Sequence, residues 1–159
     1  LDIPDDLQRE DIIPKDLRIY NYKSESKFVE IDKIEKFKAI LLKSKKPVLI
    51  LGAGIRIANE SKRAITFAEK LGIPILLTWG AKDIIQHSHY LNMGGLGVCG
   101  PRGGNFAAQK SDLVIAIGTR LSQMITGGKQ ELFAPEAIRT YQKLFLTTNS
   151  LVIHIRKYQ

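Results

Sequence analysis

Glycine-containing segments carry the residues of this sequence that could contact a phosphorylated ligand. The segment GAGIR at residues 52–56 places two glycines where a strand would turn into a helix, and such a turn lets a phosphate approach backbone N–H groups closely. The full dinucleotide-binding fingerprint needs a third glycine, but position 57 is isoleucine. The segment alone is therefore compatible with a ligand-binding turn and equally with a tight strand–helix turn that binds nothing.

Two further segments add side chains to this pattern. TWGAKD at residues 78–83 presents Trp79, which could stack on a flat ring or pack into a core. GTRLSQMITGG at residues 118–128 presents Arg120, whose planar guanidinium could hold a phosphate through two hydrogen bonds or form a surface ion pair instead. Both segments directly follow apolar runs, so we expect them at the ends of strands.

Groups that could perform catalysis are scarce in this sequence. The histidines at positions 87, 89 and 154 do not form a metal-ligand spacing with Cys99 or with the carboxylates. No serine or cysteine lies in a recognisable nucleophile turn. Cys99 stands among glycines, where a small packing role is the simpler interpretation. We therefore predict no catalytic residue and no metal ligand in this chain.

Apolar runs alternate with helical patterns along the sequence. Buried strands are expected at residues 47–51, 73–78 and 113–117, with a fourth at 151–155. Helices are expected from Ile31 onward, over residues 59–71 before Gly72, and around residues 106–110. Strands that are apolar throughout indicate a parallel sheet covered on both faces. We therefore predict a three-layer α/β/α domain with a doubly wound, Rossmann-like sheet, whose ligands would lie at the carboxyl ends of the strands.

Composition separates a connector from a folded domain and narrows the partners and compartment expected for this chain. Residues 1–28 are polar and interrupted by Pro14, so we predict a connector there and a folded domain at residues 29–159. The apolar runs are far shorter than the ~20 residues that span a bilayer, and the single cysteine suits a reducing, cytoplasmic compartment. The net charge is +8, but its lysines concentrate between residues 33 and 46, as on a solvated helix face. We expect neither nucleic acid nor a membrane as a partner.

Taken in order, these segments resemble a known family. The matching stretches, between about Lys46 and Gly127, are KPVLILGAGIR, AEKLGIPILLTWGAKDII and HYLNMGGLGVCGPRGGNFAAQKSDLVIAIGTRLSQMITG. They resemble the central domain of thiamine diphosphate-dependent enzymes of the acetolactate synthase-like group. The resemblance implies a deoxyhypusine-synthase-like nucleotide-binding fold, which in different members holds FAD, holds ADP or serves as a scaffold alone.

The resemblance also implies what lies outside this chain. Thiamine diphosphate and Mg²⁺ would be bound by neighbouring domains, because the activating glutamate and the Gly-Asp-Gly…Asn motif of the family are not found here. The opening LDIPDDLQ resembles the last strand of the preceding pyrimidine-binding domain, so we expect a piece of a longer enzyme. Within this chain, the resemblance assigns nucleotide contacts to Gly52, Ala53, Gly54, Thr78, Trp79, Gly80, Gly95, Leu96, Gly97, Gly118, Thr119 and Arg120.

The chain departs from the FAD-binding members of that group. Met124 stands where a second phosphate-binding arginine is usual, and Ser122 stands where the first acid is usual. No acid follows Ile155 to hold a ribose, and residues 138–150 do not match the family pattern, so about 20 C-terminal residues are atypical. These departures favour a weakly bound ADP-type ligand over FAD.

The parent enzyme implied by this resemblance would decarboxylate 2-oxo acids and join the products, as a dimer or tetramer. Within it, we expect this domain to act as a scaffold and as a holder of an ADP- or FAD-type nucleotide, without activity of its own. A free-standing nucleotide-binding module is the alternative that the sequence leaves open.

Overall fold

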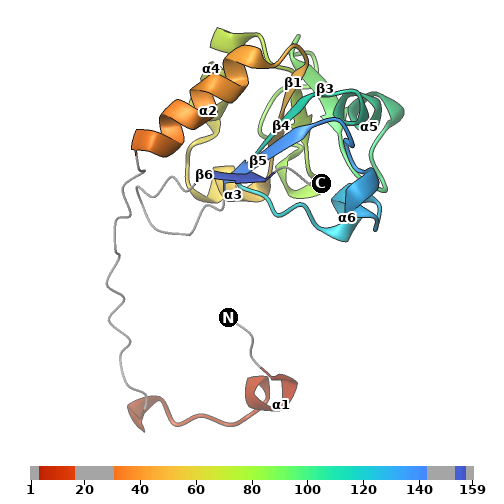
Figure 1. Cartoon of the computed structure of the whole chain (residues 1–159). Helices are drawn as coiled ribbons and strands as arrows, with labels where there is room; N and C mark the ends of the chain where they lie inside the picture. Colours follow the sequence, from red (N-terminus) through yellow and green to blue (C-terminus); the bar gives the residue numbers. More distant parts are fainter. Residues whose placement is uncertain (1–3, 17–30, 143–152, 157–159) are drawn as a thin grey trace.

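The structure is a computed structural model, and it describes residues 4–16, 31–142 and 153–156 (Figure 1). Within these residues the chain forms one six-stranded sheet with the strand order β3-β2-β1-β4-β5-β6. The strands are β1 Pro47–Leu51, β2 Ile75–Leu77, β3 Asn92–Gly95, β4 Leu113–Ile117, β5 Ile138–Gln142 and β6 Ile153–Arg156.

Helices cover both faces of this sheet. They are α2 Ile31–Lys43, α3 Ala53–Ile57, α4 Ser61–Leu71, α5 Arg102–Gln109 and α6 Gln123–Thr126, with the 3-10 helices η2 Trp79–Ala81 and η3 Gln130–Leu132. Figure 1 shows α2 and α4 together on one side of the sheet and α5 and α6 on the other. The three-layer α/β/α arrangement predicted from the sequence is confirmed.

Successive side chains of each strand point to opposite faces of the sheet, so an apolar strand supplies core residues to both faces. In β1, Leu49 and Leu51 belong to the core beneath α2, α3 and α4, whereas Val48 and Ile50 belong to the core beneath α5 and α6. All four side chains are buried, as expected for a central strand of a parallel sheet. α4 ends at Gly72, whose φ of +65° is the left-handed conformation that glycine adopts readily at a helix C-terminus.

The edges of the sheet differ from the sequence-based expectation. β3, with the sequence NMGG, lies inside the glycine-rich segment and pairs parallel to β2. β5 falls in the stretch expected from the sequence to be atypical, and it pairs parallel to β4. β6 covers part of the fourth predicted strand, but it pairs antiparallel to β5, so the expectation that this strand joins the parallel sheet is wrong. β3 and β5 carry no long apolar run, which is why periodicity does not find these two strands.

Strand order brings two turns together at the centre of the sheet. β1 lies between β2 and β4, with Leu51 opposite Leu77 on one side and Ile117 on the other. The chain leaves β1 through α3 and α4 toward β2 on one face, and reaches β4 through α5 on the other. The carboxyl ends of β1 and β4 therefore flank a topological switch point, where ligands bind in open α/β sheets.

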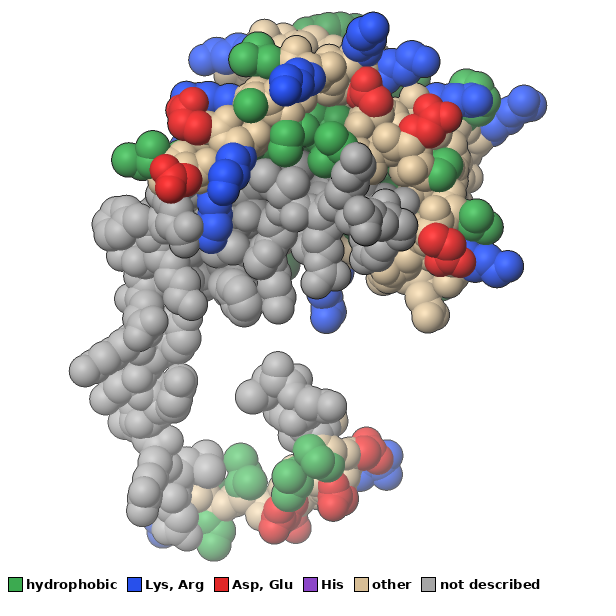
Figure 2. All heavy atoms as spheres, viewed as in Figure 1, with side chains coloured by type: hydrophobic (Ala, Val, Ile, Leu, Met, Phe, Trp, Pro, Cys, Tyr) green, Lys and Arg blue, Asp and Glu red, His purple; other side chains and the backbone are tan. Residues whose placement is uncertain are grey.

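The segment before the sheet domain contains α1 Asp5–Gln8 and the 3-10 helix η1 Pro14–Asp16. Residues 4–15 are exposed throughout. The remainder of the predicted connector at 1–28 lies outside the described residues, so the domain boundary stays a prediction. On the described part of the chain, no helix has the length and apolar character needed to cross a membrane. On the face shown in Figure 2, basic side chains are dispersed and acidic ones stand among them.

Candidate functional site

All twelve residues that the sequence assigns to nucleotide contact lie at the carboxyl ends of strands. Residues 52–54 follow β1, residues 78–80 follow β2, residues 95–97 end or follow β3, and residues 118–120 follow β4. We refer to these four turns as the carboxyl edge. Their position there agrees with the sequence-based prediction, whereas binding of a ligand by them is a separate question that the fold alone does not answer.

The turns after β1 and β4 pack against each other through their backbones. A Cβ atom added at Gly52 would overlap the carbonyl oxygen of Gly118 and Cβ of Thr119, and one added at Gly54 would lie 2.8 Å from the same carbonyl oxygen. Gly118 itself has φ +66° and faces the backbone N of Ile55. These glycines are therefore required by turn–turn packing, whether or not a phosphate approaches them.

Several backbone donors of the carboxyl edge already have acceptors within the chain. The N–H of Gly52 donates to the carbonyl oxygen of Ile117, and that of Gly54 donates to Gly118, both at 2.9 Å. The N–H groups of Thr78, Leu96 and Gly97 donate to Leu51, Leu77 and the side chain of Asn105. A diphosphate would therefore have to use other donors at this edge, since these five are satisfied by the fold.

Asn105 holds the turn after β3. Its Oδ1 accepts from the N–H of Gly97 at 2.9 Å, and its Nδ2 donates to the carbonyl oxygens of Gly97 at 2.9 Å and Gly100 at 3.2 Å. Gly97 has φ +105°, and a Cβ there would lie 2.5 Å from the carbonyl oxygen of Met124. The same carbonyl accepts from the N–H of Val98, so the turn after β3 is fixed to α6.

Two larger side chains of the carboxyl edge face solvent. Trp79 is 53% exposed, so it does not belong to the core. Arg120 is exposed, and among residues 4–16, 31–142 and 153–156 no carboxylate forms an ion pair with it. Its carbonyl oxygen accepts a hydrogen bond from the hydroxyl of Thr119 at 3.2 Å. An aromatic face and an unneutralised guanidinium are groups that can contact a base and a phosphate.

An ion pair ties the first two turns of this edge together. Arg56, on α3, donates from a guanidinium nitrogen to Asp83, which follows η2. The hydrogen bond from Arg56 holds the pKa of the Asp83 carboxyl below its ordinary value. Both side chains are largely exposed, so the pair contributes mainly to the position of the Trp79 turn relative to α3 rather than to overall stability.

Metal-binding chemistry finds no support at this site. Within the described parts of the chain, no three His, Cys, Asp or Glu side chains gather closely enough to hold a metal ion. The described donor set therefore does not fit a resident Mg²⁺, and the expectation that this chain supplies no metal ligand stays a prediction. Met124 is 46% exposed on α6 and offers no charge to an anion.

The opposite edge of the sheet, which we call the amino edge, is fixed by Asp112 just before β4. Its carboxylate accepts from the backbone N–H groups of Lys45 at 2.7 Å and Lys46 at 2.9 Å, and from the hydroxyl of Ser44. Burial raises the pKa of Asp112, but the hydrogen bonds from Ser44, Lys45 and Lys46 together lower it by more than burial raises it. The pKa of Asp112 is therefore below its ordinary value.

Sequence reasoning did not identify Asn105, Asp112 or the Arg56–Asp83 pair. A signal existed for Asn105, because asparagine close after a glycine-rich turn often bonds to the backbone of that turn. Asp112 and Ser44 are 68 residues apart in sequence, and Arg56 and Asp83 are 27 apart. No spacing rule predicts contacts at such separations.

Comparison with known proteins gives consistent matches. A family model described as the central domain of thiamine pyrophosphate enzymes matches residues 34–153. A 3D-(3,5/4)-trihydroxycyclohexane-1,2-dione hydrolase of Clostridium perfringens is 38% identical over 118 residues, covering 74% of this chain and 18% of that protein. Proteins of the same name match from Geobacillus thermodenitrificans, at 41% over 101 residues (64% and 16%), and Bacillus thuringiensis, at 39% over 118 residues (74% and 17%). The chain thus spans less than a fifth of the length of these curated relatives.

Proposed function

This chain belongs to the family of thiamine pyrophosphate enzyme central domains, and from that premise we propose that it is the structural middle domain of a larger thiamine diphosphate-dependent enzyme. The observation that supports this role is the construction of the carboxyl edge. Its turns are held by backbone packing and internal hydrogen bonds, and the described residues contain no cluster of metal ligands. A domain of this kind can set the geometry between catalytic domains without taking part in the reaction.

For the whole enzyme, we propose hydrolysis of a cyclic 1,2-dione. The support is the printed activity of relatives that are 38–41% identical to this chain. Cleavage between the two carbonyl carbons would add one water molecule and release a carboxylic acid, so turnover could be followed as base consumption. Thiamine diphosphate and Mg²⁺ would be held by the other domains, and assembly into a dimer or tetramer would bring those domains together. The sequence resemblance alone had favoured 2-oxo acid decarboxylation and carboligation.

An assay of the full-length protein against the isolated chain separates these possibilities. With thiamine diphosphate and Mg²⁺, the full-length protein is expected to consume trihydroxycyclohexane-1,2-dione, and the isolated chain is expected to be inactive on the dione and on pyruvate. Turnover of pyruvate but not of the dione by the full-length protein would return the assignment to the acetolactate synthase-like reaction. Turnover by the isolated chain would contradict the scaffold role.

We further propose that the carboxyl edge contacts an ADP-type nucleotide through Arg120. The support is the exposed guanidinium, which has no carboxylate partner within the described residues, together with the exposed ring of Trp79 at the same carboxyl edge. FAD fits less well, because the position of a second arginine is held by Met124. A free-standing nucleotide-binding module remains the alternative if no larger protein contains this chain.

A further inference from the structure

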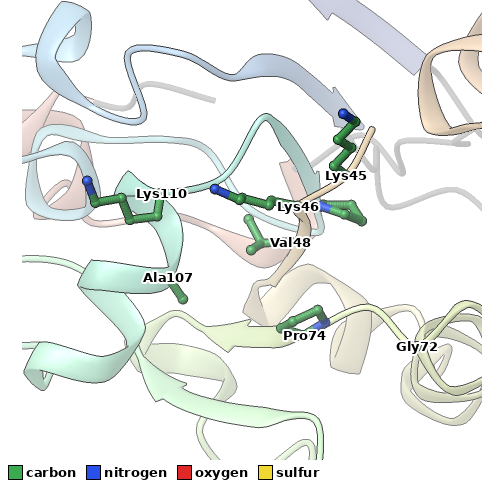
Figure 3. A pocket seen from close by; sticks show the side chains of 8 residues that line it. Lys45, Lys46, Val48, Gly72, Pro74, Ala107 and Lys110 are labelled. Atoms are coloured by element: carbon green, nitrogen blue, oxygen red, sulfur yellow. The ribbon is translucent and has the colours of Figure 1, made fainter. Parts of the chain in front are cut away.

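A groove of about 370 Å³ lies at the amino edge, away from the predicted nucleotide site. Its apolar side is formed at the start of β1, just before β2 and on α5, and its basic side is formed by lysines that follow α2 and α5. Figure 3 shows these lysines along one side and the apolar side chains on the other. The residues are Lys45, Lys46, Lys110, Val48, Pro74 and Ala107.

The carboxylate of Asp112 does not pair with the lysine ammonium groups of this groove. Asp112 lies beside it, but its oxygens accept hydrogen bonds from backbone N–H groups and from Ser44, not from the lysine ammonium groups. Lys110 has Nζ 5.9 Å from the ring centre of Phe106, a contact that leaves its charge in place. An occupant with carboxylates and apolar side chains would therefore complement both sides of the groove.

The segment that contains α1 has this chemistry. Residues 5–11 contain four carboxylates, at positions 5, 6, 10 and 11, and one guanidinium, at Arg9. Arg9 forms an ion pair with Asp5 at 2.8 Å, so Arg9 does not neutralise the other three carboxylates. Leu7, Ile12 and Ile13 are 55%, 64% and 60% exposed. Figure 2 shows the acidic and apolar side chains next to one another on this segment.

We propose that residues 4–16 dock in the amino-edge groove of their own chain. Residues 17–30 number fourteen, and a stretch of that length can span up to about 46 Å. The groove begins just beyond the end of α2, a helix of 13 residues that is about 20 Å long. The connector therefore reaches the groove without strain. Docking would place the end of the preceding domain beside the amino edge, away from the proposed nucleotide contact.

Paramagnetic broadening in the full chain tests this contact. A nitroxide is attached at Pro4→Cys in a Cys99→Ser background, and amide signals are recorded in a ¹⁵N-labelled sample. We expect the signals of Val48, Gly72 and Ala107 to broaden, while those of Gly80 and Thr119 at the carboxyl edge stay sharp. Raising the salt from 0.15 to 1 M should weaken the broadening, because the Debye length falls from about 8 to about 3 Å.

Charge reversal supplies matched controls. The triple variant K45E/K46E/K110E should lose the broadening, whereas K36E/K62E/K129E, with the same net charge and exposed positions elsewhere, should keep it. Adding D6K/E10K/D11K to the first triple variant should restore it. Absent broadening, broadening centred on the carboxyl edge, or broadening that survives K45E/K46E/K110E would overturn the proposal. A mixing experiment excludes docking between copies: one chain carries ¹⁵N without a nitroxide, and the other carries the nitroxide without ¹⁵N. Broadening in this mixture would also overturn the proposal, since a second copy would then be the occupant.

Discussion

At the carboxyl edge, backbone atoms of one turn lie directly against backbone atoms of the next, whereas at the amino edge a side-chain carboxylate holds two backbone N–H groups. The first arrangement leaves no room for a Cβ atom at Gly52 or Gly54. The second depends on the charge of Asp112 and on polar atoms near the surface. The carboxyl edge should therefore be sensitive to the volume of a substitution, and the amino edge to pH.

Gly52→Ala should destabilise the domain most, by about 3 kcal/mol of unfolding free energy, because the new methyl group would overlap the backbone of Gly118. Gly52 has φ −115°, a value that alanine adopts freely, so the effect would report overlap alone. Urea denaturation of both proteins gives the difference.

Gly127→Ala is the matched control for that change. Gly127 has φ +78° and no atom within 4 Å of an added Cβ, so only backbone conformation is perturbed, at a cost of about 1 kcal/mol. Equal losses for Gly52→Ala and Gly127→Ala would mean that turn–turn packing does not limit the carboxyl edge.

Asn105→Ala should come second, with a loss of about 2 kcal/mol, because it removes a side chain with three hydrogen bonds and leaves Gly97 N–H without its acceptor. Hydrogen exchange should show lost protection at Gly97 before Leu96, whose N–H bonds to Leu77. Gln123→Ala, at an exposed amide, should change stability by less than about 0.5 kcal/mol. A similar small change at Asn105 would refute its role in the turn.

Apart from the controls, Asp112→Asn should have the smallest effect, about 1 kcal/mol near pH 7, because one of the two accepting oxygens becomes an NH₂ group and the other loses its charge. The folded-state pKa of Asp112 is lowered, so its contribution is present above the unfolded-state pKa and is lost as pH falls through the folded-state value. The difference between wild type and Asp112→Asn should therefore shrink below about pH 4. A difference that stays constant or grows in urea melts down to pH 2 would contradict this.

The sequence predicted the centre of this fold better than its edges. β1, β2 and β4 were found because their side chains are apolar and nearly all buried, and α4 was found with its C-terminal glycine. β3 was missed because Asn92–Gly95 pairs through its backbone and has a single large apolar side chain. α5 begins at Arg102, before the predicted start at 106, since two glycines hide its first turn.

The position of the candidate site could also be predicted from the sequence, but the packing role of its glycines could not. Turns that follow neighbouring parallel strands must lie at one edge, so the positions of Thr78 and Arg120 could be predicted. The contact between Gly52 and Gly118 depends on β1 and β4 being neighbours, and strand order is not encoded in local periodicity. Glycines that looked like phosphate-binding positions are therefore also packing positions.

The most direct test of the account is a calorimetric titration of ADP and FAD into the wild-type chain, Arg120→Ala and Lys70→Ala. Arg120 lies at the carboxyl edge and Lys70, an exposed cation at the end of α4, lies near the amino edge. Loss of a charge-assisted hydrogen bond of ~1.5–3 kcal/mol should weaken ADP binding roughly ten- to a hundredfold in Arg120→Ala, and Lys70→Ala should bind as wild type does. Submicromolar binding of FAD, or ADP binding that is indifferent to Arg120→Ala, would contradict the nucleotide proposal, and no binding of either would leave the scaffold role alone.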